Sequence, residues 1–354
     1  MIIHKLTKIM IMKRNITIFA IVLMALSTAF SCKNSKTLLP NVGGKAGEVV
    51  LVMDKTLWEG DLGSELRLVL GGDCPYLAQR EPMYSLVNVT PAGFVDMFKV
   101  HRNIILFNID TKVEKDGLIY RNDVWAYPQC VIQISAKDGA GALEVFKDNN
   151  ERILSTLEQA ERDRIIANSK LYEDITIAES VRQIFGGSPH FPTGYRLKKK
   201  TDDFVWIADD KQYSIQGIFI YKYPAAEKEN FTEKNIIEHR NNILEKNVPG
   251  MFDNTWMTTS TYVPPIVEFI RFRGRQFAQT RGFWEVHNDF MGGPFVSHSF
   301  YSKDGKDIIV AEAFVYAPKY DKRQLLRQVE SILYSFEWDN DKKSQENSAE
   351  SEKQ

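Results

Sequence analysis

The hydrophobic pattern of the first half of the chain alternates between short apolar runs and stretches whose apolar positions recur every three or four residues. Short runs bounded by turn-forming residues predict strands, and the longer period predicts helices. Asn103 to Asp110 is almost continuously apolar, which is typical of a strand in the middle of a sheet. Strands are predicted at 48–54, 84–89, 103–110, 118–126 and 130–136, and helices at 56–70, 91–98 and 139–171.

The hydrophobic pattern of the second half is different, because long runs with alternating apolar and polar positions follow one another with short turns between them. This pattern predicts an antiparallel meander sheet packed by helices. Gly292-Gly293-Pro294 and Asp304-Gly305 are expected to supply two of its turns. Strands are predicted at 195–198, 204–208, 213–223, 257–262, 266–273, 276–287, 296–301 and 308–316, and helices at 175–185, 232–246 and 322–333.

The two patterns together predict an α+β protein of two domains, with a mixed sheet and helices in the first and the meander in the second. Gly186-Gly187-Ser188-Pro189 closes the helical stretch between them and marks the boundary. The expected organisation is a signal peptide (1–31), a lipidated tether (32–47), an N-terminal domain (48–171), a helical linker (172–192), a C-terminal domain (193–338) and a disordered tail (339–354).

The start of the chain has the pattern of a secretory signal rather than that of a membrane span. A basic segment with Lys5, Lys8, Lys13 and Arg14 precedes the apolar run from Ile16, which ends at Cys32. The preceding Ala29-Phe30-Ser31 is a loose lipobox, so Cys32 is the predicted site of lipidation. An uncleaved anchor with an incidental cysteine is the alternative.

The residue after the cysteine bears on the destination of such a lipoprotein. It is Lys33, with no aspartate to indicate retention in the inner membrane, and no acidic run that would indicate export to the surface follows. The expected location is the outer membrane, on its periplasmic side, with the lipid (palmitate among its chains) as the contact with the membrane.

Composition and charge narrow the classes of partner. The 354 residues are 44% hydrophobic and 26% charged, which is ordinary for a globular protein. Removal of the leader, which carries four basic residues and no acidic one, lowers the formal net charge from −1 to −5. A mildly acidic body argues against nucleic acid as a partner.

Two cysteines remain after Cys32. Cys74 and Cys130 would form a disulfide in an oxidising periplasm, or remain as two buried free thiols. The sequence leaves both alternatives open, because it does not give the distance between their Cα atoms.

Alternation along the predicted meander suggests a ligand-binding surface. Arg271, Arg273 and Arg275 are expected on one face of a strand, and Glu285 with His287 on the same face of the next. His298 and Glu312 follow on two further strands, and Phe283 and Tyr301 supply aromatic rings. Such a patch would bind an anion or a sugar. A solvated face with arginine–glutamate pairs is the alternative.

A metal site is the weaker chemical hypothesis. His287, Asp289 and His298 lie on or between two predicted strands, and these residue types would ligate zinc or iron. A metal-dependent hydrolase centred on the three residues is therefore an alternative function. No cofactor is predicted.

Several of these segments resemble a family of Bacteroidota lipoproteins known as a domain of unknown function of the DUF4837 type. The resemblance rests on the lipobox and tether, on Asn103-Ile104-Ile105 with Trp125-Ala126-Tyr127-Pro128-Gln129, and on the strand pair from Arg271 to Trp284. It covers nearly the whole mature chain and implies an envelope lipoprotein without assigned activity. The expected function is non-catalytic binding or scaffolding of an envelope protein or a small anionic or sugar ligand; surface glycan binding is a further alternative.

Overall fold

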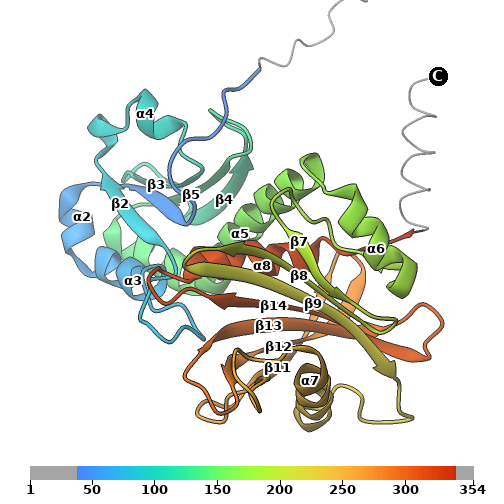
Figure 1. Ribbon diagram of the computed structural model, residues 1–354. Coiled ribbons are helices and arrows are strands. Elements are labelled where there is room, and N and C mark those ends of the chain that lie inside the picture. The colour runs from blue at the N-terminus through green and yellow to red at the C-terminus, as the bar shows by residue number, and fades with distance from the viewer. Residues whose placement is uncertain (1–37, 340–354) are drawn as a thin grey trace, which may run out of the picture. The chain divides into compact units, whose positions relative to one another are not determined.

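Short β-branched runs and amphipathic helices build the N-terminal domain as a mixed sheet covered on both faces. The structure, a computed structural model, describes residues 38–339 (Figure 1). The elements of this domain are β1 (Glu48–Val52), α2 (Lys55–Glu59), α3 (Asp61–Val69), β2 (Ser85–Val89), the 3-10 turn Pro91–Gly93, α4 (Asp96–Lys99), β3 (Asn103–Ile109), β4 (Gly117–Asn122), β5 (Cys130–Ala136) and α5 (Gly139–Leu171).

The order of this sheet is β2-β1-β3-β5-β4, with β4 antiparallel to β5 and the other neighbours parallel. The apolar strand β3 is therefore central, as its sequence predicts. One face packs on α3 and α5 through Leu66, Phe146 and Ile153, and the opposite face packs on the segments that carry Phe94 and Trp125. Burial on both faces explains why β3 reads as a continuous apolar run.

The C-terminal domain is built around one large antiparallel sheet. Its elements are α6 (Ile175–Phe185), β6 (Gly187–Ser188), β7 (Arg196–Lys200), β8 (Phe204–Lys211), β9 (Ser214–Pro224), α7 (Glu233–Asn247), β10 (Met257–Thr259), β11 (Ile266–Phe272), β12 (Arg275–Val286), β13 (Gly292–Tyr301), β14 (Asp307–Tyr316), α8 (Arg323–Tyr334) and β15 (Glu337–Trp338).

The sheet order is β10-β12-β13-β14-β9-β8-β7, with β11 paired to β12, while β6 and β15 pair separately. The predicted meander β11-β12-β13-β14 is present, and β9 from earlier in the chain adds a second antiparallel run beside β14. The fold class is therefore the predicted one, α+β with two domains.

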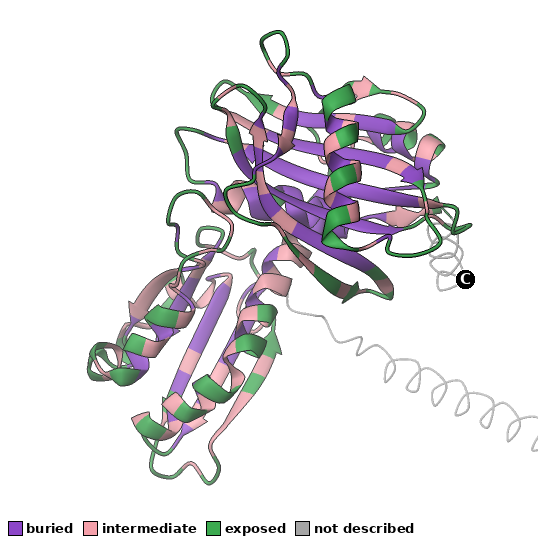
Figure 2. Cartoon of the chain, turned by 90° about the horizontal axis from the view of Figure 1, so that it is seen from below, coloured by how far each residue is buried: buried purple, intermediate pink, exposed green. Residues whose placement is uncertain are grey.

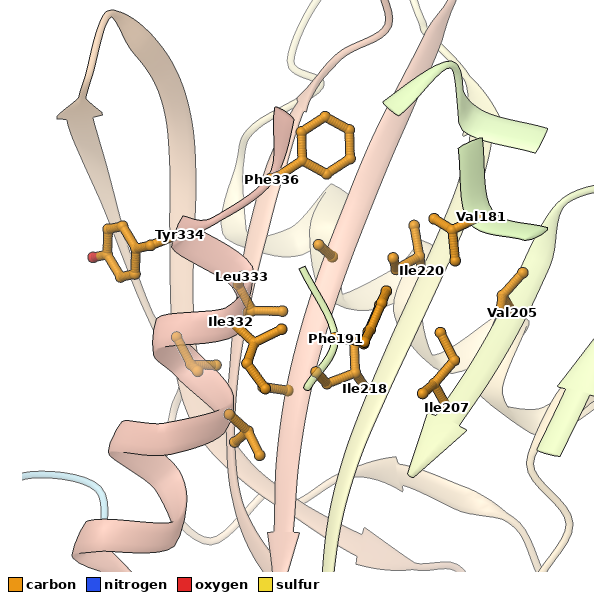
Figure 3. Close-up of a cluster of buried hydrophobic side chains, with 14 of the residues drawn as sticks. Val181, Phe191, Val205, Ile207, Ile218, Ile220, Ile332, Leu333, Tyr334 and Phe336 are labelled. Atoms are coloured by element: carbon orange, nitrogen blue, oxygen red, sulfur yellow. The ribbon is translucent and has the colours of Figure 1, made fainter. Parts of the chain in front are cut away.

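Helices cover both faces of the large sheet. On one face α6 and α8 pack on Ile207, Ile218 and Ile220, and the close-up shows Ile332 and Leu333 of α8 pointing into this cluster beside Phe191 (Figure 3). On the other face α7 lies across the strands, with its outer side exposed (Figure 2). Because side chains alternate between the two faces of each strand, the sheet has a hydrophobic core on each face, and helices cover both cores.

One predicted turn lies instead within a strand. Gly292, Gly293 and Pro294 belong to β13, and the β12–β13 turn lies before them at Asn288, which has a φ of 62°. A Cβ atom on Gly293 would lie 2.2 Å from the carbonyl oxygen of Val315 and 3.1 Å from the indole nitrogen of Trp284. The glycine is required by close packing against the Val315 carbonyl and, less tightly, Trp284, and not by a turn.

The helix α8 is tied to the N-terminal domain by charged side chains. The carboxylate of Glu81 accepts hydrogen bonds from the backbone N–H groups of Lys322 (2.7 Å) and Arg323 (2.8 Å), which are otherwise unsatisfied at a helix start. Arg327 forms a bidentate ion pair with Glu158 of α5, and Tyr84 donates a hydrogen bond to the same carboxylate at 2.8 Å. Only 8% of the Arg327 side chain is exposed.

Some predictions concern parts of the chain that the structure does not describe. The signal peptide, Cys32 and all but the first residue of the predicted tail lie outside residues 38–339. Between residues 38 and 339, none of the helices combines the length and hydropathy needed to cross a bilayer.

We expect Glu158→Ala to lower the free energy of unfolding by about 3 kcal/mol, because it leaves the buried Arg327 guanidinium without its counter-charge. Urea unfolding followed by circular dichroism measures this change. Glu59→Ala is the matched control, since the Lys55–Glu59 pair is exposed and contributes at most about 0.5 kcal/mol. Equal effects of the two substitutions would contradict the structural role of Arg327.

Candidate functional site

The three arginines of the predicted ligand-binding surface do not share a face, so this expectation is wrong. Arg273 (φ 46°) and Gly274 (φ 81°) form a two-residue turn between β11 and β12. Across that turn Arg271 pairs with Gln276, and Phe272 pairs with Arg275. Arg271 and Arg275 therefore lie on opposite faces of the sheet, because the chain reverses between them.

Two of these arginines already have partners within the protein. Arg275 donates hydrogen bonds to the carbonyl oxygens of Phe336 (2.9 Å) and Leu333 (3.3 Å) and thereby caps the end of α8. Burial lowers the pKa of Arg275 to about 10. Arg273 forms an ion pair with Asp163 at 2.7 Å. Both side chains are structural.

His298 and Glu312 are also divided by the sheet and are not available to a ligand. Glu312 is fully buried under α7, where Arg240 donates to its two carboxylate oxygens at 2.9 and 2.7 Å. His298 points to the α8 side and stacks on Phe277 with ring centroids 4.0 Å apart. Burial, with the nearby Arg275 second, holds the pKa of His298 well below its usual value.

The geometry also contradicts the metal hypothesis. His298 pairs with Gln279 on β12, eight residues before His287, which at ~3.4 Å per residue places the two histidines about 27 Å apart. One zinc or iron ion cannot bind both, since its ligands lie about 2 Å from the metal. Among residues 38–339 no group of three or more His, Cys, Asp and Glu side chains is arranged to hold a metal ion.

Cys74 and Cys130 are both free thiols, so the disulfide alternative is not realised. Cys130 lies at the start of β5, and Cys74 lies in the loop between α3 and β2. Burial raises the pKa of each thiol to about 11. Neither is a reactive cysteine at neutral pH.

Part of the predicted set does come together, at the end of the large sheet where β12 turns into β13. A cavity of about 950 Å³ lies there, and Glu285, His287 and Asp289 line it. The other lining residues are Leu77, Ala78, Ser260, Tyr262, Val263, Phe283, Trp284, Val286, Asn288, Phe290, Met291, Gly292 and Gly293. We call this cavity the Phe290 pocket.

Local hydrogen bonds hold the loop that forms the Phe290 pocket. The N–H of Val286 donates to the Met291 carbonyl at 2.9 Å, and the carboxylate of Asp289 accepts from the N–H of Phe290 at 2.7 Å. The loop therefore presents the ring of Phe290 entirely to solvent. Tyr262, 89% exposed, is a second open ring in the lining of the pocket.

The charge of the Phe290 pocket limits its ligands. Besides the phenol of Tyr262, its ionisable lining residues are Glu285, His287 and Asp289, and its lining contains neither lysine nor arginine. The two carboxylates have no ion-pair partner among the described residues. An anionic ligand would be repelled here, whereas exposed rings and hydrogen-bond acceptors suit an uncharged or cationic one.

Sequence reasoning missed Tyr262 and Phe290, the two open rings. A usable signal exists in both stretches, because Asn288-Asp289-Phe290 and Tyr262-Val263-Pro264 place large apolar residues next to turn formers. An aromatic residue at a turn is more often exposed than one inside a strand.

Comparison with known protein families assigns each domain separately. A family model described as a domain of unknown function (DUF4837) matches residues 174–335. The C-terminal domain is thus similar to the DUF4837 family. A second model, also described as a domain of unknown function (DUF8532), matches residues 43–170. The resemblance to DUF4837 is thus confirmed, although the segments from Asn103 to Gln129 that contributed to it fall under the DUF8532 model.

The remaining comparisons do not indicate a biochemical activity for this chain. No curated protein matches this chain. A crystal structure of a protein from Bacteroides thetaiotaomicron is similar at 10% identity and a TM-score of 0.23, over 43% of this chain. The chain spans 45% of the length of that protein. The two family models thus match residues 43–170 and 174–335, and neither description names an activity.

We expect Cys74 and Cys130 to be alkylated without prior reduction once the protein is unfolded. In the folded protein they should react slowly, because Cys130 is buried, Cys74 is partly buried, and both thiols are protonated. Peptide mass mapping after iodoacetamide treatment, with and without urea, measures both states. Labelling that requires a reductant would show a disulfide instead.

Proposed function

We propose that the protein is a lipoprotein of the cell envelope, anchored through Cys32 to the periplasmic face of the outer membrane, which binds a saccharide without chemical turnover. The anchor is supported by the leader that ends at Cys32. The binding function is supported by one observation, the Phe290 pocket with its open aromatic rings and unpaired carboxylates.

A sugar fits the Phe290 pocket better than the small anion that the sequence also suggests. The C–H face of a pyranose ring stacks on an aromatic side chain, and its hydroxyl groups donate hydrogen bonds to carboxylates. Phe290 and Tyr262 offer the rings, and Glu285 and Asp289 offer the acceptors. The volume of about 950 Å³ suits an oligosaccharide segment of a few residues.

The proposal assigns no reaction to the pocket. A hydrolytic site needs an acid, a base and a nucleophile held in mutual hydrogen-bond geometry. Among the described contacts, the side chains of Glu285, His287 and Asp289 form no hydrogen bond with one another, and His287 stacks on Trp256 with ring centroids 4.2 Å apart. This arrangement supports binding.

We expect Phe290→Ala to weaken saccharide binding about fivefold to tenfold, since a stacked ring contributes about 1–1.5 kcal/mol. Isothermal titration calorimetry with maltohexaose, mannohexaose, xylohexaose and chitohexaose measures the affinity. Stability should not change, because the ring is wholly exposed.

Phe269→Ala provides the matched control, because this ring is also exposed (75%) and lies on β11 outside the Phe290 pocket. Equal affinities of the wild-type protein and Phe290→Ala for every sugar bound would contradict the assignment of the pocket. Failure of all four sugars to bind would contradict the proposal that the ligand is a saccharide.

For the anchor, we expect Cys32→Ala to abolish incorporation of labelled palmitate in a Bacteroidota host, because the thioether-linked lipid needs the Cys32 sulfur. Cys74→Ala, which removes a thiol of the folded domain, should leave the labelling unchanged. Labelling that persists in Cys32→Ala would refute the lipoprotein assignment.

A further inference from the structure

A cavity of about 680 Å³ lies where the chain enters the folded unit, and three exposed apolar side chains line it. The backbone N–H of Val42 donates to the carbonyl oxygen of Tyr127 at 3.1 Å, which places this entry beside the loop between β4 and β5. Tyr127, Leu171 and Tyr172 belong to the lining, with 59%, 74% and 55% of each residue exposed. We call these three residues the entry patch.

The exposed residues at the end of α5 depart from the pattern of an amphipathic helix. Leu171 is the last residue of α5, and Tyr172 is its C-cap. Leu171 follows the buried Ile166 by five residues, which at about 100° per residue turns its side chain about 140° away from the core. Positions on that side of a helix are usually polar. An apolar pair there, in the same lining as the exposed ring of Tyr127, indicates a surface that contacts another apolar phase.

Most charged groups in the lining of this cavity are paired within the fold. Arg102 and Arg164 both form ion pairs with Glu161, at 3.6 and 3.2 Å, and Asp163 binds the arginine at the β11–β12 turn. Among residues 38–339, Asp123 is the one charged lining residue without an ion pair, and its carboxylate accepts a backbone N–H at 2.8 Å. The entry patch would therefore bring little unpaired charge with it into an apolar surface.

The length of the chain before Asn41 limits what such a surface can reach. Asn41 also lines the cavity, and it is nine residues after Cys32. At about 3.5 Å per residue, even a fully extended chain keeps Asn41 within about 30 Å of the Cys32 sulfur. A short tether of this kind gives an effective concentration of about 1 mM, so a contact too weak to hold a free protein is still occupied.

We propose that the entry patch contacts the lipid surface to which Cys32 is anchored, with its side chains in the interfacial layer of the bilayer. This inference rests on the proposed lipid anchor and adds the surface by which the folded protein meets the membrane. Tyrosine suits such a layer, because its ring enters the apolar side while its hydroxyl group stays in water.

The contact would set the orientation of the protein on the membrane. The patch lies at the junction of α5 and α6, and α6 packs on one face of the large sheet. Helix α7 packs on the opposite face (Figure 1). We therefore expect α7 and the loop after it to point away from the bilayer.

Fluorescence quenching tests the contact on the full chain, lipidated in a Bacteroidota host and reconstituted into vesicles of phosphatidylethanolamine and phosphatidylglycerol. Leu171→Cys carries an environment-sensitive dye, and part of the lipid carries a nitroxide on its acyl chain. We expect about threefold stronger quenching of this dye than of the same dye on Phe252→Cys. Phe252 is the matched control, because it is 64% exposed and lies in the loop after α7.

A second variant separates contact from mere proximity. Tyr172→Ser, combined with the label on Leu171→Cys, should reduce the quenching about twofold, because it removes one ring of the patch. The substitution should leave the fold intact, since more than half of Tyr172 is exposed. Unchanged quenching in this variant would show that the tether alone brings the dye near the lipid, and would overturn the proposal.

Flotation of the same vesicles distinguishes failure of the patch from failure of the anchor. Protein that floats with equal quenching at Leu171→Cys and Phe252→Cys would refute the entry patch and leave the anchor standing. Protein that does not float would refute the anchor and the patch together. A dye at Leu171→Cys that lipid does not quench in vesicles, but that is shielded from iodide in isolated cell envelopes, would refute the bilayer as the partner and indicate another envelope component.

Discussion

The ion pair between Arg327 and Glu158 is the contact on which the arrangement of the two domains depends. Both residues lie on helices, α8 and α5, and the arginine is almost completely removed from water. A buried guanidinium is tolerated only with a partner, so α8 and α5 must keep their relative position. Burial is the largest single influence on the pKa of Arg327 and lowers it, but Glu158, Tyr84 and Glu161 together outweigh burial, so the pKa is raised. Polar contacts fix the two ends of α8 as well, with Glu81 at its start and Arg275 at its end.

These structural pairings also explain how the ligand site arises. Most charged residues near α8 form ion pairs or hydrogen bonds within the fold. The candidate ligand-binding residues are the charged groups that have no ion-pair partner among the described residues. At the β12–β13 turn these are the carboxylates of Glu285 and Asp289.

The sequence predicts the elements of this fold better than the places where they meet. The uninterrupted apolar run of β3 indicates a central strand, and the helical period from Gly139 to Leu171 gives both ends of α5, because local patterns follow burial directly. The prediction that the three arginines share one face is wrong because a two-residue turn at Arg273 reverses the chain. A shift of one residue in register moves every side chain to the other face. Phe290 and Tyr262 could not be assigned to one cavity from the sequence, since the strand pairing that places both in its lining joins residues far apart in the chain.

The long helix α5 has a consequence for how the two domains can be separated. Its first half supplies Phe146 and Ile153 to the core of the DUF8532 domain, whereas Ile166 near its end belongs to the core of the DUF4837 domain. Cutting the chain between residues 170 and 174 would therefore expose Ile166 on the N-terminal fragment and leave a cavity in the core of the C-terminal fragment. The two families are distinct in sequence, yet in this chain one helix serves the cores of both, and the C-terminal fragment alone would lack part of its interior.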